Sequence, residues 1–344
     1  MMAWLVLPAQ SQAQAGSGPS LKFYSADDRA GQISSEPASS AIQEEAMVPA
    51  AALKLAEGEQ FLLWVELDKG RLSVQSRQPD GGLRLDQEIP VSIGKNGYGK
   101  ILEGDQKTPV GVYRLTSFLS DNMLDDEYGL GAFPLNYPNV LDRQHGWTGS
   151  GIWLHGLPKK VDTRPLWDSD GCVVIDNDSL KAMHDYITTG LTHMVLSDQP
   201  ISWVPARENA RRGESLLETF EAWRQAWEAK DNKSYLGFYA DDFSDFNRNK
   251  AQWSEYKGRV NNSKRWIEVS ASKVSLFADL KNPELVTVRY YQDYKSNNYR
   301  WSGWKEQQWR ESDDGWQIVY EGNGYRTSVK YNIVSRTYSG MQQL

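Results

Sequence analysis

A histidine and the single cysteine of the chain lie close together in IWLHGLPKKVDTRPLWDSDGCVVID, residues 152–176. A cysteine attacks as its thiolate, and a nearby imidazole lowers the pKa of the thiol below its free value of about 8.5. If the loop between them folds back between adjacent strands, His155 can act as the base for Cys172. The amides around Gly171 and Cys172 could then hold an oxyanion, and Gly171 would let a substrate approach closely.

The first residues and the cysteine count point to export. Residues 1–15, MMAWLVLPAQSQAQA, have an apolar run followed by the small-residue pattern Ala13-Gln14-Ala15, with no Lys or Arg before the run. This predicts a truncated signal peptide and a periplasmic protein. A lone thiol in an oxidising compartment is prone to damage unless it has a function. A free cysteine is nevertheless more often a buried small hydrophobic residue than a catalyst, so the presence of Cys172 alone does not establish catalysis.

The motifs around the two residues resemble the L,D-transpeptidase catalytic domain family. Its signature joins a His-Gly pair to a downstream Ser/Thr-x-Gly-Cys, here His155-Gly156 and Ser169-Asp170-Gly171-Cys172. GDQKTPVGVYRL, residues 104–115, resembles the family's Thr-Pro-x-Gly-x-Phe/Tyr element. FPLNYPN, residues 133–139, and the segment 146–149 resemble the subset that acts on stem peptides in Gram-negative envelopes. The resemblance runs from Phe61 to Ser197.

The resemblance implies a mechanism and a set of site residues. His155 takes the proton of Cys172, whose thiolate attacks the carbonyl on the L-centre of diaminopimelate in a peptidoglycan stem peptide and forms a thioester. The carbonyl of Gly156 is expected to orient His155. The candidates for oxyanion or substrate contacts are Gly171, Asp170, Ser169, Trp153, Arg164 and Tyr137. For the charged residues of the loop, which include Lys159 and Lys160, the alternative is a solvated charge.

Two departures from the family pattern bear on the acceptor. Many transpeptidases have His before the Gly-Cys pair and Arg two residues after Cys, where this chain has Asp170 and Val174. That Arg is placed to meet substrate carboxylate, so its absence favours water as acceptor. The chain is thereby similar to L,D-carboxypeptidases that trim tetrapeptide stems to tripeptides in curved and helical bacteria and carry a similar C-terminal unit. The alternatives are an L,D-transpeptidase, which shares the steps up to the thioester, and a catalytically inactive cell-wall binding scaffold.

Strand-like segments would hold these residues. FLLWVELDKGRLSVQS, which starts at Phe61, alternates apolar and polar residues around Asp68-Lys69-Gly70 and predicts a hairpin. Asp178 or Ser179 is expected to cap a helix that ends at Thr188. Further strands are expected at 87–93, 111–116, 151–155 and 194–196. The first domain, residues 59–200, is therefore expected to be mainly β with helices at its side, in the β-sandwich or barrel form of the L,D-transpeptidase type.

A second domain is expected over residues 215–335, after a solvated linker at 201–214 that contains Pro205 and three arginines. Apolar residues recur at helical spacing from Leu216 to Trp227. Long β segments follow at 266–277, 284–294, 299–309 and 315–320. This order resembles the cone-like, nuclear-transport-factor-like α+β fold. Aromatic side chains of these strands are expected in the core, with glycan or peptide binding as the alternative, and they are Tyr290, Tyr291, Tyr294, Tyr299, Trp301, Trp304, Trp309 and Trp316.

Charge and residue spacing argue against several other kinds of ligand. The net charge of −7 argues against a general nucleic-acid binder. The four histidines have no metal-ligand spacing, so no metal and no cofactor are predicted. Residues 94–100 lack the Ser or Thr that a phosphate-binding loop needs after its Lys. Residues 16–58 are typical of a lead-in arm, through which a homodimer is a further hypothesis.

Overall fold

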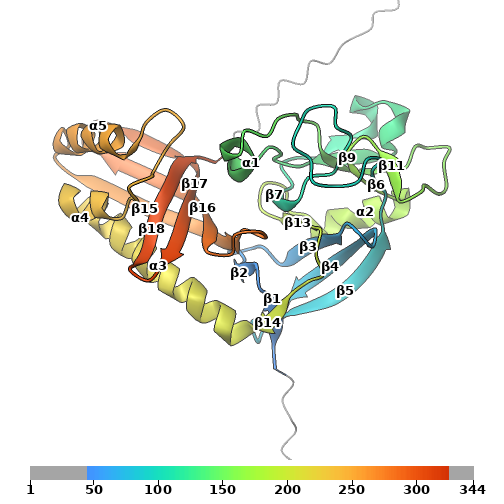
Figure 1. Cartoon of the computed structure of the whole chain (residues 1–344), viewed down its shortest axis with the longest axis horizontal. Coiled ribbons are helices and arrows are strands. Elements are labelled where there is room, and N and C mark those ends of the chain that lie inside the picture. The colour runs from blue at the N-terminus through green and yellow to red at the C-terminus, as the bar shows by residue number, and fades with distance from the viewer. Residues whose placement is uncertain (1–44, 325–344) are drawn as a thin grey trace, which may run out of the picture. The chain divides into compact units, whose positions relative to one another are not determined.

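The computed structural model describes residues 45–324, which belong to one compact unit that begins at Glu44. Within these residues a mainly β domain precedes an α+β domain, so the predicted fold class is confirmed (Figure 1). The expected signal peptide, most of the expected arm and the end of the expected second domain lie outside the described residues. The dimer hypothesis concerns mostly the same part of the chain.

Two larger sheets form the first domain. The five-stranded sheet has the order β5 (Leu83–Pro90), β4 (Arg71–Arg77), β3 (Phe61–Glu66), β13 (His193–Ser197), β7 (Gly111–Arg114). The four-stranded sheet has the order β12 (Val173–Ile175), β10 (Trp153–Gly156), β9 (Gly131–Pro134), β8 (Leu119–Ser120). Two short pairs are added by β6 (Ile93–Gly94) with β11 (Trp167–Ser169) and by β1 (Met47–Pro49) with β14 (Trp203–Pro205).

The predicted hairpin is confirmed, because β3 and β4 pair antiparallel with Asp68-Lys69-Gly70 at the tip. Gly70 has a φ of +59°, a conformation that residues other than glycine rarely adopt.

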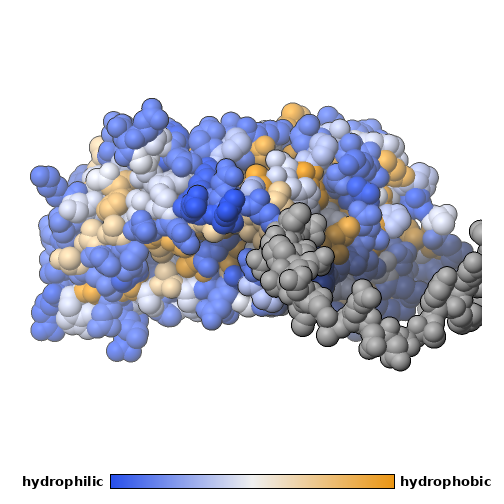
Figure 2. All heavy atoms as spheres, turned by 90° about the horizontal axis from the view of Figure 1, so that it is seen from below, coloured by the Kyte–Doolittle hydropathy of each residue, from blue (hydrophilic) through white to orange (hydrophobic). Residues whose placement is uncertain are grey.

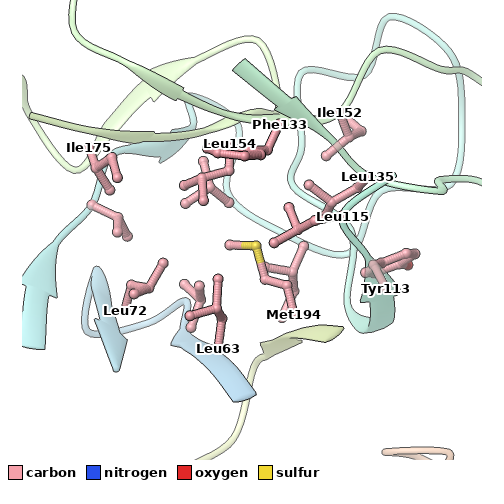
Figure 3. Close-up of a cluster of buried hydrophobic side chains, with 14 of the residues drawn as sticks. Leu63, Leu72, Tyr113, Leu115, Phe133, Leu135, Ile152, Leu154, Ile175 and Met194 are labelled. Atoms are coloured by element: carbon pink, nitrogen blue, oxygen red, sulfur yellow. The ribbon is translucent and has the colours of Figure 1, made fainter. Parts of the chain in front are cut away.

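A single apolar core joins the two larger sheets. Leu63 and Leu72 of the hairpin, Met194 of β13 and Leu154 of β10 are all fully buried. Figure 3 shows these side chains pointing toward one another from opposite sides of the cluster. The central position of Leu154 matters for function, because the next residue on the same strand is His155. Core packing therefore fixes the strand that carries the predicted base.

Short helices connect these strands. They are α1 (Val140–Gln144), α2 (Asn177–Tyr186) and two single-turn 3-10 helices, η1 (Asp121–Met123) and η2 (Asp126–Tyr128). The predicted cap of α2 was wrong by two or three residues. The carboxylate of Asp176, directly after β12, accepts hydrogen bonds from the amides of Asp178 and Ser179 and so begins the helix earlier.

The second domain is a helix packed on an antiparallel sheet. The sheet has the order β18 (Gly315–Asn323), β17 (Arg300–Ser312), β16 (Leu285–Ser296), β15 (Ile267–Ala278), β2 (Ala52–Lys54). The helices are α3 (Ala206–Glu228), α4 (Asn232–Gly237) and α5 (Lys250–Asn262). Leu216, Phe220, Trp223 and Trp227 of α3 pack against the sheet, as their spacing predicted.

The segment 201–214, expected to be a solvated linker, lies between the two matched domains but has regular secondary structure. Those residues form β14 and the first turns of α3. The side chain of Asn209 is buried and donates hydrogen bonds to the carbonyl oxygens of Pro49 and Ala52, at 3.3 and 2.8 Å. The end of the expected arm thus supplies strand β2 and a docking partner for α3, a contact that charge patterning along the sequence cannot reveal.

The aromatic side chains of the second domain divide into two groups. Tyr290, Tyr294, Trp309 and Trp316 are buried in the core between α3 and the sheet, so the default prediction is confirmed for them. Tyr299 is exposed, while Tyr291, Trp301 and Trp304 are half-buried.

Figure 2 shows one face of the molecule, on which hydrophilic residues predominate and hydrophobic ones are scattered. Among residues 45–324, no helix is both long and apolar enough to span a membrane.

Candidate active site

Two neighbouring parallel strands place Cys172 and His155 on one face of a sheet. β10 and β12 pair with Leu154 opposite Val173 and His155 opposite Val174. Cys172 directly precedes β12, so it lies level with Trp153. Because side chains alternate along a strand, Cys172, Trp153 and His155 point to the same side. The loop between the strands therefore folds back as the sequence required.

His155 is held as a neutral imidazole. Its ring is buried, and Nδ1 lies 2.8 Å from the carbonyl oxygen of Gly156. A carbonyl only accepts, so Nδ1 carries the proton and Nε2 has a free lone pair. Burial lowers the pKa of His155 to about 4; the Gly156 carbonyl opposes this shift and the charge of Arg164 adds to it. The ring is therefore an unprotonated base at neutral pH.

Cys172 is held as a neutral thiol. Burial raises its pKa to about 11, while the Trp153 amide and the charge of Arg164 act in the opposite direction. The sequence-based expectation of a lowered thiol pKa is therefore wrong for this state of the protein. Sγ donates to the carbonyl oxygen of Gly151 at 3.4 Å. Within residues 45–324, no hydrogen bond joins Sγ to His155, so the thiol must rotate before the base can take its proton.

The turn before Cys172 is fixed by three contacts. Ser169 Oγ donates to the carbonyl oxygen of Cys172 at 2.7 Å and accepts from the amide of Gly171 at 3.1 Å. Gly171 has a φ of +123°, and a Cβ there would lie 2.7 Å from the carbonyl oxygen of Lys107. The Gly171 carbonyl accepts from Thr108 Oγ1 at 3.0 Å. Ser169 thus already occupies the Gly171 amide, one of the two amides expected to hold an oxyanion.

The charged loop residues have partners within the protein. Asp170 is exposed and lies 2.7 Å from Lys95 Nζ, which fits the solvated-charge alternative. Arg164 Nε lies 2.7 Å from the carboxylate of Asp168. The charge of Arg164 lowers the pKa of both Cys172 and His155. Arg164 therefore keeps its place as a candidate for substrate carboxylate.

Lys159 is engaged elsewhere in the same region. Its ammonium lies 3.3 Å from Asp121 and 3.4 Å from Asp126, so it ties the loop to the two 3-10 helices instead of being free for substrate.

Two aromatic side chains affect the geometry of this region. Tyr137 was a candidate for substrate contact, but its side chain is buried and its hydroxyl donates to the carbonyl oxygen of Thr148 at 3.0 Å. It therefore positions the 146–149 segment. Tyr128, at the end of η2, was missed from the sequence. Its ring centroid lies 4.9 Å from that of Trp153 and 5.1 Å from that of His155. No motif marks this tyrosine, since a distant loop brings it to the site.

The described residues contain no group of three or more His, Cys, Asp or Glu arranged to hold a metal ion. The chemistry available to the side chains described here is that of a thiol, an adjacent imidazole base and a nearby guanidinium, which together suit acyl transfer through a thioester.

Comparison with known proteins identifies both domains. Residues 59–196 match the L,D-transpeptidase catalytic domain, and residues 215–322 match the Cds6 C-terminal NTF2-like domain. Bd1075 from Bdellovibrio bacteriovorus is 32% identical; the match covers 82% of this chain and 99% of Bd1075, with a TM-score of 0.64. The helical cell shape determining protein Pgp2 from Campylobacter jejuni is 26% identical over 80% of this chain and 95% of Pgp2, with a TM-score of 0.64. No curated protein matches the chain significantly.

The fold and the matched catalytic domain are those of an L,D-transpeptidase-type enzyme. The chain belongs to the L,D-transpeptidase family of peptidoglycan enzymes, with an NTF2-like C-terminal domain.

Proposed function

We propose that this protein is an L,D-carboxypeptidase that removes D-alanine from tetrapeptide stems. His155 Nε2 takes the proton from Cys172 Sγ as sulfur attacks the carbonyl carbon on the L-centre of diaminopimelate. The carbon–nitrogen bond to D-alanine breaks, and the leaving amine takes the proton from His155. Water then attacks the thioester with His155 as base, which releases the tripeptide and restores the thiol.

One observation carries this proposal: the placement of Cys172 and His155 on the same face of adjacent strands, with His155 Nδ1 bonded to the Gly156 carbonyl. That bond fixes the imidazole in the tautomer whose Nε2 can accept a proton. Because the resting thiol has a raised pKa, proton transfer has to accompany the attack instead of preceding it. The Cys172 amide, level with Trp153, is the donor proposed for the developing oxyanion.

The preference for water as acceptor rests on position 174. Where many transpeptidases have Arg, Val174 is buried in β12, and its backbone exchanges hydrogen bonds with Ser92. No cation stands at that position to receive an acceptor's carboxylate. Arg164, near the dyad, is proposed to bind the carboxylate of the donor stem.

Two further parts of the proposal concern location and the second domain. We place the enzyme in the periplasm, because the family acts on the cell wall and residues 1–15 have the pattern of a signal peptide.

Binding of glycan or stem peptide by the second domain stays a hypothesis. The aromatic rings still available for it are the half-buried and exposed ones, above all Tyr299.

The test is to incubate the full chain with a disaccharide tetrapeptide, with and without an amine acceptor, and to identify products by mass spectrometry. Tripeptide and free D-alanine in both conditions would support the carboxypeptidase. Crosslinked or amine-exchanged product would make the enzyme a transpeptidase.

Variants assign the chemistry to the dyad. Cys172→Ser keeps the size of the side chain but is a poor nucleophile, and His155→Gln removes the base; both should abolish turnover. His145→Gln, the same change at an exposed histidine, serves as the matched control. Turnover that survives Cys172→Ser would refute the thioester mechanism, and no turnover by any of the proteins would favour the scaffold.

A further inference from the structure

A cavity of about 130 Å³ lies between the first domain and the sheet of the second. Its lining includes Arg114 of β7 and Arg289 and Glu306, which face each other on β16 and β17. Neither Cys172 nor His155 lines it. The cavity is therefore separate from the catalytic residues, and it lies on the face of the sheet opposite the one that packs on α3, because Val288 and Tyr290, which flank Arg289, point into that core.

Both arginines are buried with unsatisfied donors. Arg114 and Arg289 are 4% and 3% exposed. Nε and Nη2 of Arg114, and Nε and Nη1 of Arg289, have no hydrogen-bond partner among the residues described here. A buried guanidinium without acceptors is costly, since its hydration is lost and not replaced. The four nitrogens belong to two residues that line a common cavity, and an anion bound there would supply the missing acceptors.

Arg289 is held in position before any ligand arrives. Its Nη2 donates to the carbonyl oxygen of Gly190 at 3.0 Å, and its guanidinium carbon lies 3.4 Å from the ring centroid of Trp304. The nearest carboxylate, Glu306, is 3.8 Å from Nε, beyond hydrogen-bond range. Burial is the main cause that lowers the pKa of Arg289, and the positive charge of Arg114 lowers it further.

Three cations and three carboxylates line the cavity, and they differ in their partners. Lys281 is exposed, while Asp142 and Asp279 accept from the amides of Asn139 and Asn282. Arg114, Arg289 and Glu306 are the buried charged residues that remain. Glu59 also acts on Arg289, but its oxygens already accept from the amides of Ala56 and His193 and bond the His193 ring. Among residues 45–324, no hydrogen bond to the Glu306 carboxylate is found, and its Oε1 lies 3.8 Å from Arg289 Nε. This charge pattern matches a ligand with a carboxylate at one end and an ammonium at the other.

We propose that the cavity is a binding site for a small zwitterionic amino acid, whose carboxylate is held by Arg114 and Arg289 and whose ammonium is held by Glu306. A volume of about 130 Å³ accommodates such a ligand but not a folded peptide or a glycan chain. Because its walls come from both domains, the bound ligand would join them.

Isothermal titration calorimetry on the full chain, with glycine, acetate and methylammonium as probes, tests the proposal. Acetate and methylammonium each keep one of the two charged groups of glycine. We expect saturable one-site binding of glycine, binding of acetate weaker by about ten-fold, and none of methylammonium. Absence of saturable glycine binding would overturn the proposal, as would equal affinity for glycine and acetate.

Two variants locate the site. Arg114→Met should weaken glycine at least about ten-fold, whereas Arg310→Met, the same change on the same sheet at a residue paired with exposed Asp242, should leave it unchanged. Thermal unfolding of the ligand-free proteins adds an independent readout. Removing an unsatisfied buried charge should leave Arg114→Met as stable as the parent or more so, whereas a purely structural arginine would lower the unfolding temperature.

If Arg114→Met does not fold, the Glu306→Gln variant tests the proposed site instead. It preserves the shape of the side chain and should abolish the preference for glycine over acetate. An unchanged preference would refute the assigned role of Glu306 and with it the zwitterion site.

Discussion

Thr108 Oγ1 donates a 3.0 Å hydrogen bond to the carbonyl oxygen of Gly171, the residue directly before Cys172. The same oxygen accepts from the amide of Gly94 at 2.9 Å. The Thr-Pro-x-Gly element and the Ser-Asp-Gly-Cys element, far apart in the sequence, are therefore joined through one buried hydroxyl. This contact explains why a threonine remote from the chemistry belongs to the motif set.

Thr108→Val, which keeps the shape and removes the hydroxyl, should lower the free energy of unfolding by about 1–3 kcal/mol, because the Gly94 amide and the Gly171 carbonyl lose a buried partner. Turnover should fall by about ten-fold or more, since the nucleophile turn loses its anchor. Urea denaturation and D-alanine release measure the two effects. Thr108→Ser keeps the hydroxyl and is the control; a Val variant as active as the Ser variant would contradict the anchoring role.

The reactivity of Cys172 should depend on pH in a characteristic way. A thiol pKa of about 11, against an ordinary value of 9.0, makes the thiolate fraction at neutral pH about a hundred-fold smaller. The rate of iodoacetamide labelling of the native protein should therefore keep rising toward pH 11, whereas the urea-unfolded chain should level off about two pH units earlier. Cys172 is the only cysteine, so mass spectrometry reads the reaction directly. A plateau near pH 7 in the native protein would show a low-pKa thiolate instead.

The placement of Cys172 beside His155 could be predicted because the motifs that contain them are local. His155-Gly156 and the Gly171-Cys172 pair each lie in a short segment, and the strand period then fixes which side chains share a face. The environment of the dyad could not be predicted in the same way. The raised pKa of Cys172 comes chiefly from burial, which depends on packing from several segments, and Tyr128 reaches His155 from a loop without a motif.

The same contrast between local sequence signals and long-range packing holds for the fold. The alternation in the β3–β4 hairpin and the long strands of the second domain identify these elements from the sequence alone. The start of α3 was missed because its arginines are typical of solvent, while Asn209 and the close packing of Gly213 against Leu53 are tertiary contacts. The pairing of β2 with β15 joins residues that are distant along the chain, so the arm could not be assigned to the second domain beforehand.

His155 should make the folded protein sensitive to mild acid. Its pKa is about 4 in the folded protein against an ordinary 6.5, so the unfolded chain binds more protons between these values. The histidine's contribution is fully present above pH 6.5 and is lost as the pH falls toward 4, by at most about 3 kcal/mol. In His155→Gln, unfolding free energies from urea denaturation should fall less steeply over this range than in the parent protein. Parallel curves for the two proteins would mean that the ring is not held neutral by burial.

Tyr128 should act through its ring and not through its hydroxyl. The ring stands nearly perpendicular to His155, at 71°, and also packs on Trp153. Tyr128→Ala opens this side of the imidazole and should reduce kcat by about ten-fold with little change in KM, because a loosely held base spends less time aligned with the thiol. Tyr128→Phe keeps the ring and should retain nearly full activity in the same D-alanine release assay. If the Phe variant were as impaired as the Ala variant, the hydroxyl would have to contact the substrate or the developing oxyanion.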